Sequence, residues 1–211
     1  KSMLVTQIRP VTRQKYRIEA EGLPPFVLYK GEVSRYHLEK DKELSMETYR
    51  EILEEVLIKR AKLRTLHLLE QGDRTRKGLE ERLLQNGYPP EAVEAALAYV
   101  GSFHYVDDKR YAVNYIQNQK NRKGRARIMM ELRNKGVSQE DIDYAFQETE
   151  EGADTRERIR ELIRKKRKGP GKMEEKERQR LYGFLMRRGF SSSDILSVLR
   201  ESAGEWTDTD A

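Results

Sequence analysis

Cysteine is absent from this chain of 211 residues. The sequence therefore has no disulfide framework and no thiolate chemistry, and it is compatible with a reducing compartment. Hydrophobic residues make up only 36% of the chain, with a single tryptophan and three histidines. No apolar run approaches the roughly 18 residues that a membrane-spanning helix requires, and no signal-peptide core is visible. We expect a cytoplasmic protein without membrane contact, whose apolar core is small for its length.

Charged residues are abundant, and their distribution is uneven. Forty-two basic residues outnumber 36 acidic ones, which gives a net charge of +6. Five cations fall within residues 120–127 with no acid among them, and residues 164–168 are five consecutive cations followed by Gly-Pro-Gly-Lys. Such clusters are typical of proteins that meet a polyanion.

Three glycines, Gly87, Gly136 and Gly189, mark an internal repeat with spacings of 49 and 53 residues. Around each glycine, aliphatic residues lie eight and four positions before it, and a bulky apolar residue follows it directly. A β-branched residue comes six positions later and another apolar residue ten positions later. A repeat of this length predicts an array of similar units rather than one globular core.

The turn chemistry predicts how each unit folds. The glycine supplies the left-handed conformation that ends a helix, and the apolar residue after it packs back on the last turn. A helix-start residue, Pro89, Ser138 or Ser191, follows two positions later. We therefore expect a mainly α-helical protein with three tandem three-helix, helix-turn-helix-like repeats in an elongated array, comprising nine helices.

The first 44 residues follow a different pattern. Alternating apolar residues near Tyr16 and the run at residues 26–29 predict two or three short strands in a small antiparallel sheet, with Lys30-Gly31 as a turn. Ser45 is a good N-cap for the helix that follows. We divide the chain into a β-rich segment (1–44), three helical repeats (45–101, 102–152 and 153–203) and an acidic tail (204–211).

The sequence offers little that resembles a catalytic or metal site. Asp107-Asp108 is the prominent carboxylate pair, and its place before a helix is typical of capping. The three histidines share no ligand spacing. Gly169-Pro170-Gly171-Lys172 lacks the spacing of a phosphate-binding loop. We expect no enzymatic activity, no catalytic residue, no bound metal and no cofactor.

Cations recur at fixed offsets before the helix that precedes each glycine. Arg76, Arg125 and Arg178 share one offset, and Arg74, Lys123 and Lys176 share another. Cations at a helix start oppose the helix dipole, so an anionic partner would compensate for them; a solvated surface is the alternative. For residues 164–168, a phosphate-gripping loop and an ordinary helix end remain equally open. The candidate DNA-contacting residues are Arg74, Arg76, Lys77, Lys120, Arg122, Lys123, Arg125, Arg127, Arg164, Lys165, Lys166, Arg167, Lys168 and Lys172.

Residues 103–112, Phe-His-Tyr-Val-Asp-Asp-Lys-Arg-Tyr-Ala, resemble the signature segment of the RecX family, bacterial regulators of the RecA recombinase. Residues 123–128, with Glu131-Leu132 and Lys135-Gly136-Val137, resemble the family's central repeat, and residues 74–83 resemble its first repeat. The resemblance covers about residues 60 to 201. Arg125 departs from the family pattern, which often has proline there, and Gly78 stands where a stronger helix former is usual.

The resemblance implies a non-enzymatic regulator built from tandem three-helix repeats. It implies binding to RecA, to the RecA filament on single-stranded DNA and to single- and double-stranded DNA, with inhibition of ATP hydrolysis and strand exchange. It places the chain in DNA recombination and repair. We expect DNA contacts that depend on the backbone rather than on base sequence, and a monomer. A helix-turn-helix transcriptional regulator is the alternative function, and a nuclease or other hydrolase is a third class.

Overall fold

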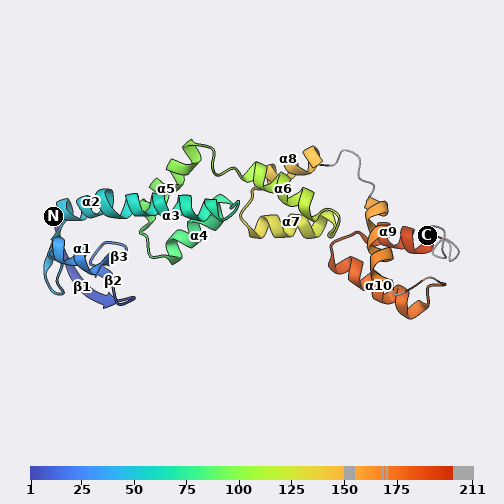
Figure 1. Cartoon of the computed structure of the whole chain (residues 1–211), viewed down its shortest axis with the longest axis horizontal. Helices are drawn as coiled ribbons and strands as arrows, with labels where there is room; N and C mark the ends of the chain where they lie inside the picture. The colour runs from blue at the N-terminus through green and yellow to red at the C-terminus, as the bar shows by residue number, and fades with distance from the viewer. Residues whose placement is uncertain (150–154, 168, 170, 202–211) are drawn as a thin grey trace. The chain divides into compact units, whose positions relative to one another are not determined.

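The computed structural model describes residues 1–149, 155–167, 169 and 171–201 (Figure 1). The chain divides into two compact units, Lys1–Asp107 and Asp108–Ala211. The first unit contains β1 (Ser2–Pro10), β2 (Lys15–Ala20), β3 (Phe26–Tyr29), α1 (Lys30–Arg35), β4 (Glu43–Ser45), α2 (Met46–Ile52), a π-helical turn η1 (Leu53–Leu57), α3 (Ile58–Glu70), α4 (Arg76–Gln85) and α5 (Pro90–Ser102). The second unit contains α6 (Asp108–Gln119), α7 (Arg125–Asn134), α8 (Gln139–Thr149), α9 (Thr155–Lys166), α10 (Glu175–Arg187) and α11 (Ser192–Arg200).

The chain is mainly helical, with three three-helix repeats and a small N-terminal antiparallel sheet. We call α3–α5 repeat 1, α6–α8 repeat 2 and α9–α11 repeat 3. Each repeat in the second unit has its own apolar cluster, whereas the cluster of repeat 1 continues into the sheet. The five-part division of the sequence stays a prediction, and its acidic tail (204–211) lies outside the described residues.

The sheet has four strands in the order β3-β2-β1-β4, each antiparallel to its neighbours. The sequence predicted two or three strands, and it missed β1 and β4. The Lys30-Gly31 turn was also wrong, because these residues begin helix α1. The Glu32 carboxylate accepts a hydrogen bond from the Tyr29 backbone N–H at 2.8 Å, so the chain enters a helix immediately after β3.

The long helical stretch after the sheet begins where the sequence predicted. The Ser45 hydroxyl accepts a hydrogen bond from the Thr48 backbone N–H, and α2, η1 and α3 continue one into the next. The sheet packs against this stretch (Figure 1), with the rings of Phe26 and Tyr49 5.6 Å apart between their centroids. A small sheet gains the apolar partner that it needs for stability in this way.

The three glycine turns are alike in the structure. Gly87, Gly136 and Gly189 have φ angles of 89°, 87° and 88°, in the left-handed region. In each turn the glycine N–H bonds to the carbonyl three residues before it, and the next residue's N–H bonds to the carbonyl five residues before that residue. This double pattern is the Schellman motif, so the predicted C-cap is confirmed at all three glycines.

The apolar positions of the repeat pattern form the repeat cores. The side chains eight and four residues before each glycine are at most 2% exposed, and those six and ten residues after it are at most 5% exposed. Burying one such aliphatic side chain contributes about 1.5–3 kcal/mol.

Repeat 3 departs from the predicted pattern at the start of the helix that precedes its glycine. Its helix α10 begins at Glu175, so Arg178 lies inside the helix, whereas Arg76 and Arg125 begin α4 and α7.

Candidate nucleic-acid interface

The basic connector, which we define as residues 120–124, joins α6 to α7 in repeat 2. Repeat 3 contacts its backbone at three points. Arg158 Nη1 donates to the Lys120 carbonyl at 2.5 Å, and Arg188 Nη1 donates to the Arg122 carbonyl at 2.8 Å. The Gly124 N–H donates to the Arg188 carbonyl at 2.7 Å. The connector is therefore held through its main chain by the neighbouring repeat.

Two glycines bring the backbones of repeats 2 and 3 close together. A Cβ atom placed on Gly124 would lie 2.5 Å from the carbonyl carbon and oxygen of Gly189 and 2.6 Å from the Phe190 nitrogen. A Cβ atom on Gly189 would collide with the backbone of Arg127. Glycine is therefore favoured at position 189 for two separate reasons. Its left-handed φ angle suits the helix cap, and its lack of a Cβ atom allows the close contact with Arg127.

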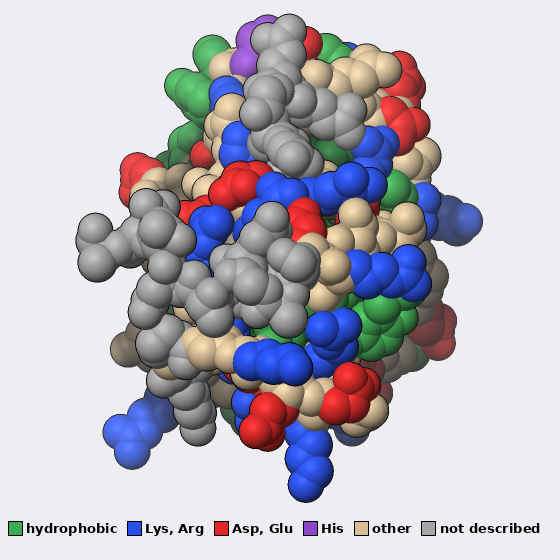
Figure 2. Space-filling view, turned by 90° about the vertical axis from the view of Figure 1, so that its right-hand side faces the viewer, with side chains coloured by type: hydrophobic (Ala, Val, Ile, Leu, Met, Phe, Trp, Pro, Cys, Tyr) green, Lys and Arg blue, Asp and Glu red, His purple; other side chains and the backbone are tan. Residues whose placement is uncertain are grey.

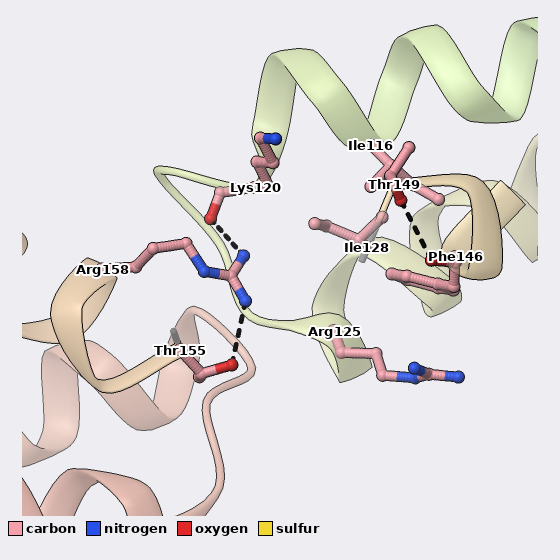
Figure 3. A pocket seen from close by; sticks show the side chains of 8 residues that line it. All are labelled: Ile116, Lys120, Arg125, Ile128, Phe146, Thr149, Thr155 and Arg158. Carbon is pink, nitrogen blue, oxygen red and sulfur yellow. Dashed lines mark hydrogen bonds between the residues drawn. The ribbon is translucent and has the colours of Figure 1, made fainter. Parts of the chain in front are cut away.

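A cavity of about 280 Å³ lies where α9 meets repeat 2. Figure 3 shows the Arg158 guanidinium at its edge, bonded to the Lys120 carbonyl and to the Thr155 hydroxyl. The Arg125 side chain extends away from Arg158, with its guanidinium carbon 4.4 Å from the centroid of the Phe146 ring. The cations around this cavity therefore do not converge on one point.

Glu131 on α7 gathers several of the predicted DNA-contacting cations. Lys123 Nζ lies 2.9 Å from both of its carboxylate oxygens, and Arg127 Nε lies 3.0 Å from one. The Tyr115 hydroxyl donates to the same carboxylate at 2.6 Å. Only 16% of the Glu131 side chain is exposed. We call this group of four side chains the Glu131 network.

The pKa values in the Glu131 network follow from these contacts. Burial acts to raise the pKa of Glu131, but hydrogen bonds from Lys123, Tyr115 and Arg127 outweigh it and leave that pKa below its ordinary value. Burial and the bond to the carboxylate raise the pKa of Tyr115. The network therefore holds an ionised carboxylate beside two cations at neutral pH.

In repeat 1, the predicted cations have partners within the first unit. Arg74 Nε donates to the Leu68 carbonyl near the end of α3. Arg76 Nη2 lies 3.0 Å from a Glu94 oxygen, and the Lys77–Glu81 pair is longer, at 3.8 Å. Both ion pairs are about half exposed or more, so solvent screens them and each contributes at most about 1 kcal/mol.

In repeat 3, Arg164, Lys165 and Lys166 form the last turn of α9, where cations complement the helix dipole. Arg164 lies 3.4 Å from a Glu157 oxygen. The Arg167 side chain is only 8% exposed and bonds to Glu177 and to the Gly171 carbonyl. Lys172 is exposed, and Lys168 lies outside the described residues.

The face of the molecule seen in Figure 2 is mixed in charge. Figure 2 shows Lys and Arg side chains in several places on the visible face, with Asp and Glu among them. Among the predicted residues of repeat 2, Arg122 and Arg125 are exposed and Lys120 is half-buried. Arg158 and Arg188 were missed at the level of sequence, because their partners lie 38 and 66 residues away. Glu131 was also missed, although it lies four residues after Arg127, a spacing that favours an ion pair on a helix.

The structure also bears on the paired carboxylates, on metal binding and on membrane-spanning helices. Helix α6 begins at Asp108, so the Asp107-Asp108 pair lies at a helix start. Within the described ranges, no three His, Asp or Glu side chains gather as metal ligands would. In the same part of the chain, every helix is too short or too polar to cross a membrane.

Models of known protein families match all three repeats. The models for the first, second and third three-helix domains of RecX match residues 61–99, 107–145 and 154–199, respectively. A crystal structure of regulatory protein RecX aligns with 94% of this chain and 100% of its own, with a TM-score of 0.58 and 26% identity. A second crystal structure, RecX from Lactobacillus salivarius, is 21% identical with a TM-score of 0.56 and shares the fold; the alignment covers 68% of this chain and 95% of that one.

Two curated relatives are similar over most of their length. Regulatory protein RecX of Clostridium acetobutylicum is 29% identical over 172 residues, which cover 80% of each chain. Regulatory protein RecX of Streptomyces coelicolor is 33% identical over 153 residues, which cover 70% of this chain and 80% of the relative. With three domain models matched in order and relatives at this level of identity, this chain belongs to the RecX family of regulatory proteins.

Proposed function

We propose that this protein regulates the RecA recombinase without catalysing a reaction itself, by binding the RecA filament on single-stranded DNA. Membership of the RecX family supports this function, since the sequence resemblance implies RecA as the partner. Repeat units joined in series suit a filament, because successive units can contact successive protomers. Inhibition of ATP hydrolysis and strand exchange would follow if the protein binds the less active arrangement of protomers more tightly.

We further propose that repeat 2 contacts the DNA backbone. The observation that carries this proposal is the basic connector, whose carbonyls are bound by Arg158 and Arg188 while Arg122 and the adjoining Arg125 are exposed. Phosphate contacts from such cations give affinity that depends on salt and carries little sequence information. Lys123 and Arg127 are paired with Glu131, so we assign them a smaller share.

Fluorescence anisotropy with labelled duplexes and single strands at several salt concentrations tests the DNA proposal. Alanine at Arg122 and Arg125 together should lower the slope of log affinity against log salt by about 1 to 2, since each cation that leaves a phosphate lowers it by about 0.7–0.9. Alanine at Arg13 and Lys40 together, which are exposed in the N-terminal part of the chain and lie outside the candidate DNA-contacting residues, is the matched control for the loss of two charges. An unchanged slope in the double variant would contradict the assignment to repeat 2.

The same assay separates the transcriptional regulator from the proposed function. A regulator that reads sequence would lose about 1–3 kcal/mol for each mismatched base pair at fixed salt. We expect unrelated duplexes of equal length to bind with equal affinity. Strong discrimination among them would favour the helix-turn-helix alternative.

A further inference from the structure

Repeats 2 and 3 meet at a joint where side chains and backbone of repeat 3 contact the backbone of residues 120–124. Repeats 2 and 3 have separate apolar clusters. The contacts between them include the Gly124–Gly189 approach and the hydrogen bonds of Arg158, Arg188 and Gly124. We call the joint closed when these contacts are made and open when they are broken.

The three hydrogen bonds meet backbone groups of repeat 2 that lie outside the hydrogen-bond ladders of its helices. The last carbonyls of a helix have no partner within it, and Arg158 bonds to the Lys120 carbonyl just after α6 ends. Gly124 is the N-cap of α7, and its N–H bonds to the Arg188 carbonyl. Arg188 also donates to the Arg122 carbonyl, so this residue binds the connector as both donor and acceptor.

We infer that repeat 3 holds the basic connector of repeat 2 in the shape that binds phosphates, with Arg158 and Arg188 as positioning residues. This inference rests on the proposed contact between repeat 2 and DNA. With the carbonyls of Lys120 and Arg122 bound to guanidinium groups, the connector keeps one backbone shape, and two further positive charges lie beside it. Because DNA binds the closed joint more tightly than the open one, phosphate binding and closure favour each other by the same factor.

Gly124→Ala tests this inference without changing any charge. The φ angle of Gly124 is −79° and its ψ angle is 168°, an extended backbone that alanine adopts without strain. The added Cβ would lie 2.5 Å from the Gly189 backbone, so the joint must open or shift. Gly124→Ser carries the same Cβ but is a good N-cap, so it separates the collision from any loss of capping.

The matched control is Gly183→Ala on α10 of repeat 3. The Cβ that it adds would meet the far end of the Arg187 side chain at 3.2 Å, which can move aside. It makes the same chemical change in the repeat that holds the connector and leaves the joint untouched. Circular dichroism of each variant confirms that its helices remain.

We expect both Gly124 variants to bind a labelled duplex more weakly at about 0.1 M salt. For each phosphate that the displaced connector no longer reaches, affinity should fall about eightfold and the salt slope by about 0.9. Gly183→Ala should bind like the unaltered protein. Equal affinity and slope in Gly124→Ser and the unaltered protein would overturn the inference. If alanine at Arg122 and Arg125 also leaves binding unchanged, the proposed DNA surface itself fails, so the two failures are distinguishable.

A second measurement uses the unaltered protein and does not depend on any variant folding. The Gly124 N–H is bonded across the joint, so its hydrogen exchange reports joint opening. We expect saturating duplex DNA to slow exchange at this amide, while the Glu21 amide, bonded to the Leu4 carbonyl in the N-terminal part of the chain, changes little. Unchanged exchange at Gly124 with DNA bound would overturn the coupling.

Discussion

Substitution of Glu131 by glutamine is expected to separate stability from DNA binding. Glu131 accepts hydrogen bonds from Lys123, Arg127 and Tyr115, and its side chain is 16% exposed. Glutamine keeps the shape of the side chain but removes the charge that holds the two cations. The network should therefore lose stability, while Lys123 and Arg127 become available to phosphates.

The size of the stability loss follows from the exposure of the partners. Hydrogen bonds to charged groups contribute about 1.5–3 kcal/mol, whereas exposed ion pairs contribute about 0–1 kcal/mol. Lys123 is 25% exposed and Arg127 is 44% exposed, so solvent screens the second pair more strongly. We expect Glu131→Gln to lower the free energy of unfolding by about 1–2 kcal/mol.

Urea denaturation measures the first effect, and duplex binding at about 0.1 M salt measures the second. If one released cation reaches a phosphate, affinity rises about eightfold. Glu140→Gln is the control, because Glu140 is exposed in the first turn of α8 and the variant makes the same charge change. Unchanged stability, or DNA affinity that falls together with stability, would contradict both expected effects.

Three further outcomes are expected. The lowered pKa of Glu131 adds stability that is present above its unfolded pKa of about 4.3 and is lost as pH falls through the folded pKa. The free energy of unfolding, measured by urea denaturation from pH 7 to pH 3, should therefore decrease less for Glu131→Gln than for the unaltered protein. An equal decrease in the two proteins would contradict this prediction. Gly136→Ala should cost about 1–2 kcal/mol in the same titration because its φ angle is 87°, whereas Gly183→Ala should be neutral or stabilising; a neutral Gly136 variant would argue against left-handed strain. Ser191→Ala should cost about 1 kcal/mol by removing the acceptor of the Asp194 N–H, and Ser193→Ala, inside α11, is its control.

The helical repeats were predictable because their signals are local. A glycine that ends a helix, the apolar residue after it and the N-cap two residues later all lie within one short segment. The structure confirms this chemistry at Gly87, Gly136 and Gly189. The caps at Ser45 and Ser191 follow from the same local logic.

The N-terminal sheet was only partly predictable, because a strand is stabilised by partners distant in sequence. β1 pairs with β2 and β4, and a register shift between Val5 and Gln7 interrupts the alternation that marks a strand. At Lys30-Gly31 the composition predicted a turn. The Glu32 side chain instead bonds to the Tyr29 backbone N–H three residues earlier and caps the helix there, a local contact that the turn prediction overlooked.

The candidate interface was also only partly predictable from the sequence. Sequence clustering identified the cations of residues 120–127, and these remain the candidates for DNA contact. It could not show that Lys123 binds Glu131, or that Arg188 binds the connector from 66 residues away. The pair of Arg127 and Glu131 was within reach of the sequence, because residues four apart on a helix are neighbours. Clustered charge predicts the sign of a partner, while the pairing that sets each cation's availability depends on the fold.

Steady-state ATP hydrolysis by RecA on single-stranded DNA, measured while this protein is added, tests whether the protein regulates RecA as proposed. We expect inhibition that is nearly complete at close to stoichiometric ratios of this protein to RecA. A variant with alanine at Arg122 and Arg125 should inhibit less in proportion to its weaker DNA binding. Hydrolysis that continues at the same rate at equimolar protein would contradict the account.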